Sequence, residues 1–254
     1  PLKYYRNNVQ GTLNILDAMQ ENQVKKMIFS STAAIFGIPK KVPIEPDDAY
    51  GPINPYGETK LCVEKMLKAC DEAHQLNYVA LRYFNAAGAD ESGLIGEDHQ
   101  PETHLIPLIL QVAAGKREKI SIFGTDYQTR DGTCVRDYVH VSDLAQAHVL
   151  AAEYLLNGGS SNTFNLGTKQ GFTVKEVIEA CRHITGHNIP VQESERRAGD
   201  PDILIASPEK AQKVLNWHIK YTNVQDIVRT AWNWHKKNPN GYTSNENLHL
   251  NHQQ

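Results

Sequence analysis

Tyr56 and Lys60 are the residues whose types and spacing first suggest chemistry. They lie four positions apart in NPYGETKLCVEKML (54–67), where an amphipathic helix is expected to begin directly after a proline. Side chains four positions apart share one helix face, so the ammonium can lie within reach of the phenol. A free phenol has a pKa of about 10, and a nearby cation favours the phenolate, which can act as a general base. A bare YxxxK pattern is more often an exposed tyrosine beside a solvated lysine. The neighbouring segments must therefore show whether this pair is catalytic.

Hydroxyl and amide side chains follow two of the expected strands. Ser30, Ser31 and Thr32 stand at the end of the apolar run MIFSS, and Tyr83 and Asn85 stand at the end of NYVALRYFN. Open α/β sheets bind their ligands at the carboxyl ends of their parallel strands. The sequence therefore predicts that these groups share one crevice with the phenol and the ammonium, where they can bind a substrate alcohol.

Helices and strands alternate through the first 85 residues. Apolar residues at helical spacing predict a helix over about 8–20, and a short apolar run predicts a buried strand at 25–31. A loop rich in proline and acid at 38–55 precedes a long helix over about 56–74, and a second buried strand follows at 77–85. This alternation favours the α/β class, with a Rossmann-like, doubly wound parallel sheet.

The pattern changes after residue 85, where a stretch rich in glycine and acid begins. We expect residues 1–85 to form the C-terminal part of the Rossmann-like domain. Residues 86–240 should form mainly a smaller α/β lobe, with some segments returning to the sheet, and residues 241–254 a polar tail. Within the lobe, a helix is expected to begin near residue 141 with Ser142 or Asp143 as its N-cap.

Composition excludes several classes of protein. The chain of 254 residues is 40% hydrophobic and 22% charged, and its net charge of -3 provides no basic field for nucleic acid or an anionic membrane. It contains no run of about 18 apolar residues that would predict a membrane span. The four cysteines lack CxxC spacing and the eleven histidines lack paired-ligand spacing on one helix, so we expect no metal site and a reducing cytoplasm.

Six segments carry a resemblance to a known family: SSTAAIFG, PYGETK, LRYFNAAGA, IFGTDYQTRDGTCVRDYVHVSDLA, FNLG and RRAGDP. In their order and spacing they resemble the UDP-glucose 4-epimerases, in the extended branch of the short-chain dehydrogenase/reductase superfamily, over nearly the whole chain. Related dehydratases carry an acidic pair after the strand-end threonine, where this chain has Ala33 and Ala34. The resemblance therefore implies an epimerase, with another NAD-dependent nucleotide-sugar epimerase as the alternative.

The resemblance implies reversible oxidation at C4 of a UDP-linked hexose, with NAD as the cofactor, so that UDP-glucose and UDP-galactose interconvert. Tyr56, as phenolate, would take the proton of the 4-hydroxyl, Lys60 would lower the phenol pKa, and Thr32 would orient or relay the proton. The residues that the resemblance assigns to NAD binding are Asn8, Ser30, Ser31, Tyr56, Lys60 and Tyr83.

Substrate binding is expected mainly in the lobe formed by residues 86–240. Arg136 and Arg197 match positions that bind the diphosphate, and Asp200 matches a residue that holds a uridine ribose hydroxyl. The full set that the resemblance implies is Thr32, Asn85, His104, Leu105, Phe123, Arg136, Arg197, Asp200 and Leu204. Leu204 falls where bulky aromatic residues exclude N-acetyl groups, so its smaller side chain predicts tolerance for UDP-N-acetylhexosamines.

The glycine-rich turn that seats the NAD pyrophosphate in this family does not occur in the 254 residues. Since each βαβ unit takes about 30 residues, roughly 60 to 90 residues of the nucleotide-binding domain are expected to be missing. Three interpretations follow: a fragment of an intact epimerase, which we favour, a truncated product with little NAD affinity, or a non-catalytic module that binds UDP-sugars. The resemblance also implies a homodimer that packs through the helices at 8–20 and 56–74.

Overall fold

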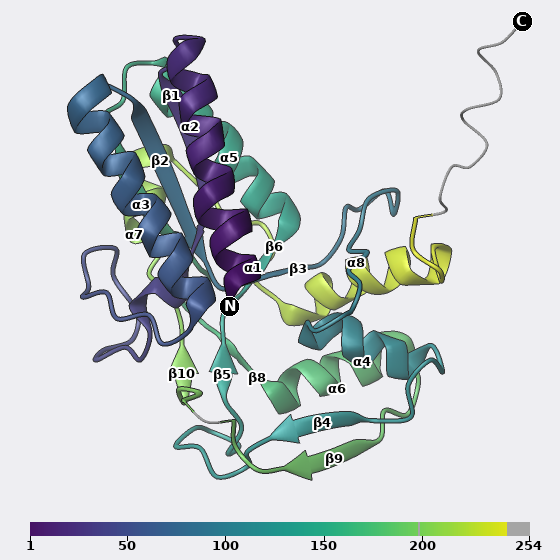
Figure 1. The fold of residues 1–254 in the computed structure, drawn as a ribbon. Coiled ribbons are helices and arrows are strands. Elements are labelled where there is room, and N and C mark those ends of the chain that lie inside the picture. The colour runs from purple at the N-terminus through teal and green to yellow at the C-terminus, as the bar shows by residue number, and fades with distance from the viewer. Residues whose placement is uncertain (198, 243–254) are drawn as a thin grey trace, which may run out of the picture.

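The computed structural model describes residues 1–197 and 199–242 (Figure 1). Its upper layer is a parallel sheet of three strands in the order β1-β2-β7, with β1 at Lys26–Thr32, β2 at Asn77–Tyr83 and β7 at Asn162–Leu166. Thr32 and Tyr83 are register partners at the carboxyl ends of β1 and β2. The two strands expected from the sequence are therefore neighbours. Most of the expected polar tail lies outside the described residues.

Helices cover both faces of this sheet (Figure 1). On one face lie α2 (Gly11–Glu21) and α3 (Pro55–His74), and on the other lie α5 (Val141–Leu156) and α7 (Glu209–Leu215). A short helical turn, α1 (Leu2–Tyr4), and a π-helix, η1 (Tyr5–Gln10), lead directly into α2. The helix expected at 8–20 therefore begins several residues earlier than predicted.

The side chains of β2 alternate between the two faces, as the pleat of a strand requires. Tyr78 and Ala80 pack in the cluster that α2 and α3 complete. Val79 and Leu81 pack in the opposite cluster, which α5 and α7 complete. Because both faces are buried, residues 78–81 of the strand form one apolar run. The α/β class with a doubly wound parallel sheet is confirmed.

A smaller lobe lies below the sheet (Figure 1). Its core joins three helices to the paired strands β4 and β9, and the residues Ile109, Ile178 and Ile227 are fully or almost fully buried there. The helices are α4 (Leu105–Ala113), α6 (Val174–Thr185) and α8 (Val224–Lys237), and the strands are β4 (Ile120–Phe123) and β9 (Val191–Ser194). No helix in the described parts of the chain is long and apolar enough to cross a membrane.

Two small sheets and one helical turn connect the sheet layer to the lobe. The first sheet pairs β3 with β6, and the second has the order β10-β5-β8. These elements are η2 (Ala33–Phe36), β3 (Asn85–Ala87), β5 (Val135–Arg136), β6 (Tyr138–His140), β8 (Phe172–Thr173) and β10 (Ile203–Leu204). Asn85, Arg136 and Leu204 lie in these elements, and Thr32 directly precedes η2.

The N-cap predicted for α5 is wrong. His140 is the N-cap, and its Nδ1 accepts a hydrogen bond from the backbone N–H of Ser142 at 3.1 Å. Asp143 is almost fully buried, and its carboxylate accepts hydrogen bonds from the backbone N–H groups of Lys220 and Tyr221 at 3.1 and 3.0 Å. The aspartate therefore fixes the loop before α8, a tertiary contact that local sequence does not reveal.

Candidate active site

A cavity of about 860 Å³ lies where the carboxyl ends of β1 and β2 meet the smaller lobe. Six residues expected from the sequence line this cavity: Thr32, Tyr56, Tyr83, Asn85, His104 and Leu105. A larger depression of about 1090 Å³ lies beside α6 and β9, and none of the expected site residues lines it. The 860 Å³ cavity is therefore the candidate active site.

The start of α3 holds Tyr56 at the cavity. Asn54 is the N-cap, and its side-chain oxygen accepts a hydrogen bond from the N–H of Gly57 at 2.9 Å. Pro55 occupies the first turn, where its missing N–H costs nothing. Gly57 lies so close to η2 that a Cβ there would stand 2.7 Å from the carbonyl oxygen of Ala34. This close approach brings the first turn of α3 next to the end of β1.

The Tyr56 phenol lies in a partly dry and aromatic environment. Burial raises its pKa, a hydrogen bond with Thr32 acts in the opposite direction, and the neighbouring phenols of Tyr83 and Tyr4 raise it further. The Tyr4 ring meets the Tyr56 ring edge-on, with centroids 5.8 Å apart. The pKa of Tyr56 is therefore raised in this structure, whereas a general base needs a lowered one.

Lys60 shares the helix face with Tyr56 but makes its hydrogen bond to the sheet. Its Nζ donates to the carbonyl oxygen of Ser30 at 2.9 Å and lies 4.8 Å from the centroid of the Phe29 ring. The same nitrogen lies 5.9 Å from the centroid of the Tyr56 ring. Burial lowers the Lys60 pKa. The ammonium is thus fixed behind the phenol, at the end of β1.

The Ser30 side chain belongs to a hydrogen-bonded chain that runs to α5. Its hydroxyl lies 2.8 Å from Nε2 of His148, and Nδ1 of His148 lies 2.7 Å from the carbonyl oxygen of Leu144. A carbonyl can only accept, so Nδ1 donates to Leu144, and in the neutral imidazole Nε2 then accepts from the serine hydroxyl. The Tyr83 ring meets the His148 ring edge-on, with centroids 6.5 Å apart. His148 therefore supports two of the expected cofactor-binding residues.

The Ser31 side chain turns away from the cavity. Its hydroxyl donates to Oε1 of Glu64 at 2.5 Å, and the residue is 2% exposed. Glu64 also forms a bidentate ion pair with the fully buried Arg82, with distances of 2.9 and 2.6 Å. Only the main chain of Ser31 is left to contact a cofactor.

Asn8 ties the N-terminal helices to α3. Its Nδ2 donates to Oγ1 of Thr59 at 2.9 Å, and the Thr59 hydroxyl donates to the carbonyl oxygen of Tyr56 at 2.9 Å. The Asn8 amide is thus joined, through one threonine, to the turn that carries the phenol. Asn8 is not among the residues that line the cavity.

Five of the expected substrate-binding residues form a second group, apart from the cavity lining. Arg136 and Asp200 form an ion pair, and the Arg197 guanidinium lies 4.1 Å above the centroid of the Phe123 ring. Leu204 is the register partner of Arg136 between β10 and β5. The backbone N–H of Asp200 donates to the carbonyl oxygen of Arg197 at 3.2 Å and joins the two pairs, and none of the five residues lines the cavity.

Asp137 connects the two groups, and sequence reasoning missed it. The Asn85 side chain donates to the carbonyl oxygen of Asp137 at 2.9 Å. The buried Asp137 carboxylate accepts hydrogen bonds from the N–H and hydroxyl of Thr168 and from the N–H of Ala206. Burial raises the pKa of this carboxyl group, although the hydrogen bonds oppose the rise. In the sequence, the available signal was its position beside Arg136 in the VRDY segment. The structure adds that Asp137 is fully buried, and a fully buried aspartate must be hydrogen-bonded.

Comparisons with known proteins identify the family. The family model described as "NAD dependent epimerase/dehydratase family" matches residues 1–167. The chain belongs to the NAD-dependent epimerase/dehydratase family. A UDP-glucose 4-epimerase from Halalkalibacterium halodurans is 60% identical over 244 residues, which are 96% of this chain and 73% of that family member.

Solved structures of family members agree with this assignment. A crystal structure of a UDP-glucose 4-epimerase is 55% identical, has a TM-score of 0.94, and is matched over 96% of this chain and 74% of its own. The UDP-glucose 4-epimerase from Bifidobacterium longum in complex with NAD+ and UDP is 41% identical, with a TM-score of 0.89 over 95% of this chain and 72% of that one. The resemblance stated from the sequence motifs is confirmed, as is NAD as the cofactor of the family.

The residues around Lys60 fit one end of this cofactor. An ammonium has three N–H donors, and among the described residues Lys60 donates one hydrogen bond, to Ser30. Two donors therefore remain for hydroxyl groups such as those of the nicotinamide ribose. The G-x-G-x-x-G turn that commonly holds the pyrophosphate does not occur in the 254 residues.

Proposed function

We propose that this chain carries the active site of a UDP-glucose 4-epimerase, which interconverts UDP-glucose and UDP-galactose at sugar C4. The observation that carries the proposal is the meeting of Thr32 and Tyr56 at the carboxyl ends of two parallel strands, with Lys60 directly behind them. A sugar hydroxyl held between a phenol and an alcohol can lose and regain a proton without exposure to bulk water. The sequence similarity to named UDP-glucose 4-epimerases supports the same reaction.

Each residue has a distinct part in the proposed reaction. NAD, when bound, would supply the hydride acceptor and donor for sugar C4. The Tyr56 oxygen accepts the proton of the 4-hydroxyl, and returns it when the hydroxyl forms again with inverted configuration. Thr32 orients that hydroxyl through its own oxygen. Lys60 favours the phenolate by its charge, an effect that grows as bound ligands exclude water from the cavity.

The second group of residues is suited to hold the UDP moiety. Guanidinium groups match the oxygens of a diphosphate, so we assign this contact to Arg136 and Arg197. Asp200 would accept a hydrogen bond from a ribose hydroxyl, and Phe123 would border the base. The adjacent position of Leu204 supports an assignment to the sugar pocket, where a leucine leaves room for an N-acetyl group.

Replacement of Tyr56 by Phe tests the catalytic assignment. The change removes one oxygen and keeps the ring, so turnover of UDP-galactose with NAD supplied should fall roughly 10²- to 10⁴-fold, while UDP binding persists. Tyr5→Phe, in an exposed tyrosine of η1, is the matched control. Unchanged turnover in the Tyr56 variant would exclude the phenol as the base. UDP binding without turnover in the unsubstituted chain would identify a binding module instead.

We also propose a homodimer that packs through α2 and α3. Leu13 and Ile15 on α2 are 46% and 51% exposed, which leaves apolar surface beside the sheet layer. A second copy of the same helices would bury it, since isologous interfaces repeat one surface on both subunits. Sedimentation analysis should show a dimer that Leu13→Glu shifts toward monomer. A monomeric unsubstituted chain at all concentrations would contradict this interface.

A cytoplasmic location is part of the proposal. The four cysteines are free thiols in the structure, and Cys134 and Cys181 are buried. Thiols without partners are typical of a reducing compartment. Cell fractionation of the tagged chain would test this assignment, and recovery outside the cytoplasm would refute it.

A further inference from the structure

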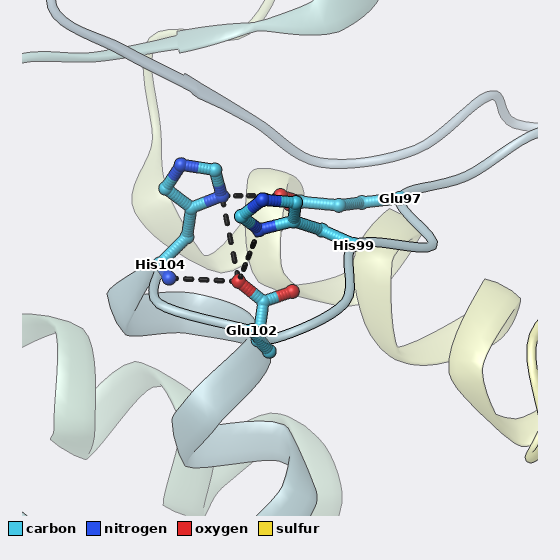
Figure 2. Close-up of side chains that lie close together, drawn as sticks. All are labelled: Glu97, His99, Glu102 and His104. Carbon is cyan, nitrogen blue, oxygen red and sulfur yellow. Dashed lines mark hydrogen bonds and ion pairs between the residues drawn. The ribbon is translucent and has the colours of Figure 1, made fainter. Parts of the chain in front are cut away.

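The loop between β3 and α4 gathers four side chains that can bind a metal ion. Glu97, His99, Glu102 and His104 each offer one ligand atom, and these atoms all lie within 4.8 Å of one another. Figure 2 shows the two imidazoles and the two carboxylates turned toward one another above the start of α4. The proposed reaction assigns no part to His99, Glu97 or Glu102.

Glu102 is the fixed centre of this cluster. Its side chain is 6% exposed, and Oε1 lies 3.5 Å from Nδ1 of His99 and 3.5 Å from Nδ1 of His104. The backbone N–H groups of Thr103 and His104 both donate to Oε1 at 2.7 Å. Hydrogen bonds of this kind hold a carboxylate in place and are typical of the groups that support metal ligands.

The two histidines present the same nitrogen to that centre. Their rings stack with centroids 5.1 Å apart and an angle of 21° between the ring planes, so both Nδ1 atoms face the carboxylates (Figure 2). Glu97 contacts Nδ1 of His104 from the other side. A single ion pair would need only one imidazole, whereas the structure places two imidazoles and two carboxylates around one point.

We infer that Glu97, His99, Glu102 and His104 bind one divalent transition-metal ion of the Zn²⁺ class. Zn²⁺ takes four nitrogen, sulfur or oxygen ligands at about 2.0 to 2.2 Å, so tetrahedral ligand atoms stand about 3.3 Å apart. The two separations of 3.5 Å from Glu102 match this spacing, whereas the shorter contact between Glu97 and His104 must lengthen, which the exposed histidine permits by rotating. Imidazole nitrogen favours Zn²⁺ over Mg²⁺ and Ca²⁺, which prefer oxygen ligands alone.

The ion would stand in the wall of the 860 Å³ cavity, which Glu97, His99 and His104 line. It would balance the charge of two carboxylates and cross-link residues 97 and 99 of the loop to residues 102 and 104, directly before α4. Charge balance and cross-linking both stabilise the loop itself. Metal binding at this site can therefore be tested independently of the proposed epimerase activity.

Calorimetric titration of the chelator-treated chain with Zn²⁺ tests the inference. We expect a one-to-one binding event and a rise in Tm that a chelator reverses. His99→Ala should weaken binding on the order of 10- to 100-fold, and Glu97→Gln, which keeps the shape but removes the charge, should weaken it in the same direction. Titration with Co²⁺ should give visible absorption bands that His99→Ala removes.

Two control variants separate this cluster from other histidines. His218→Ala changes an exposed histidine elsewhere on the surface and should leave Zn²⁺ affinity unchanged. The double variant His249→Ala, His252→Ala removes both histidines of the C-terminal segment, which lies outside the described residues, and should also leave it unchanged. No saturable one-to-one binding, or binding that the double variant abolishes and His99→Ala does not, would overturn the inference.

Discussion

Gly57→Ala tests whether the close approach of α3 to η2 sets the position of Tyr56. A Cβ at residue 57 would stand 2.7 Å from the Ala34 oxygen and 3.1 Å from Cβ of Pro52, whereas ordinary contact begins at 3.4 Å. The first turn of α3 must therefore move by about 0.7 Å. Overpacking of this kind costs about 1–3 kcal/mol, and the better helix propensity of alanine returns up to about 1 kcal/mol. We expect a net loss of about 1–2 kcal/mol in the free energy of unfolding.

The same shift should also reduce turnover. Tyr56 is the neighbour of residue 57, and a misplacement of about 1 Å can cost about 100-fold in rate, so a loss of roughly 10-fold or more is expected. Urea unfolding and an epimerase assay with NAD supplied measure the two effects. Gly11→Ala is the matched control, because its Cβ would meet only the Arg6 oxygen at 3.8 Å. Equal stability and turnover in the Gly57 and Gly11 variants would refute the reasoning.

Three further predictions concern the buried ion pair, the pH response and the sugar pocket. Glu64→Gln leaves the Arg82 guanidinium buried without a counter-charge and should cost about 3–5 kcal/mol in urea unfolding; a loss below about 1 kcal/mol would contradict this. The Glu97 hydrogen bond raises the His104 pKa, so its stabilising effect should be complete below about pH 6.5 and lost as pH rises through the raised pKa. Tm measured against pH should show this loss, and Glu97→Gln should abolish it. Leu204→Tyr should lower kcat/KM for UDP-N-acetylglucosamine more than for UDP-glucose, and equal effects would remove Leu204 from the sugar pocket.

The sequence predicted the sheet and its helices well because the apolar patterns and the residues that mark helix starts agreed there. Asn54 and Pro55 mark the start of α3, one residue before the predicted position, since proline suits the first turn of a helix. The second predicted strand ended too late: β2 ends at Tyr83, and Asn85 begins β3. The reason is tertiary, because Asn85 bonds to Asp137 through both its N–H and its side chain.

The side-chain directions at the end of β1 were only partly predictable. Ser31 shares its strand face with Phe29, two residues earlier, and Phe29 packs in the cluster with α3. The alternation of side chains along a strand therefore predicts that the Ser31 hydroxyl points toward α3. No local pattern predicts that Lys60 donates to Ser30, because this contact depends on the distance between α3 and β1.

Arg136 and Asp200 show how the proposed substrate contacts depend on each other. Their side chains are 13% and 28% exposed, and they pair with each other, so each provides the counter-charge of a partly buried group. A diphosphate that binds Arg136 competes with this carboxylate for the same guanidinium. The carboxylate that it displaces is then free to accept a hydrogen bond from a ribose hydroxyl. Under the proposed function, the affinity for UDP is therefore the difference between two sets of charge-assisted hydrogen bonds rather than the sum of two new contacts.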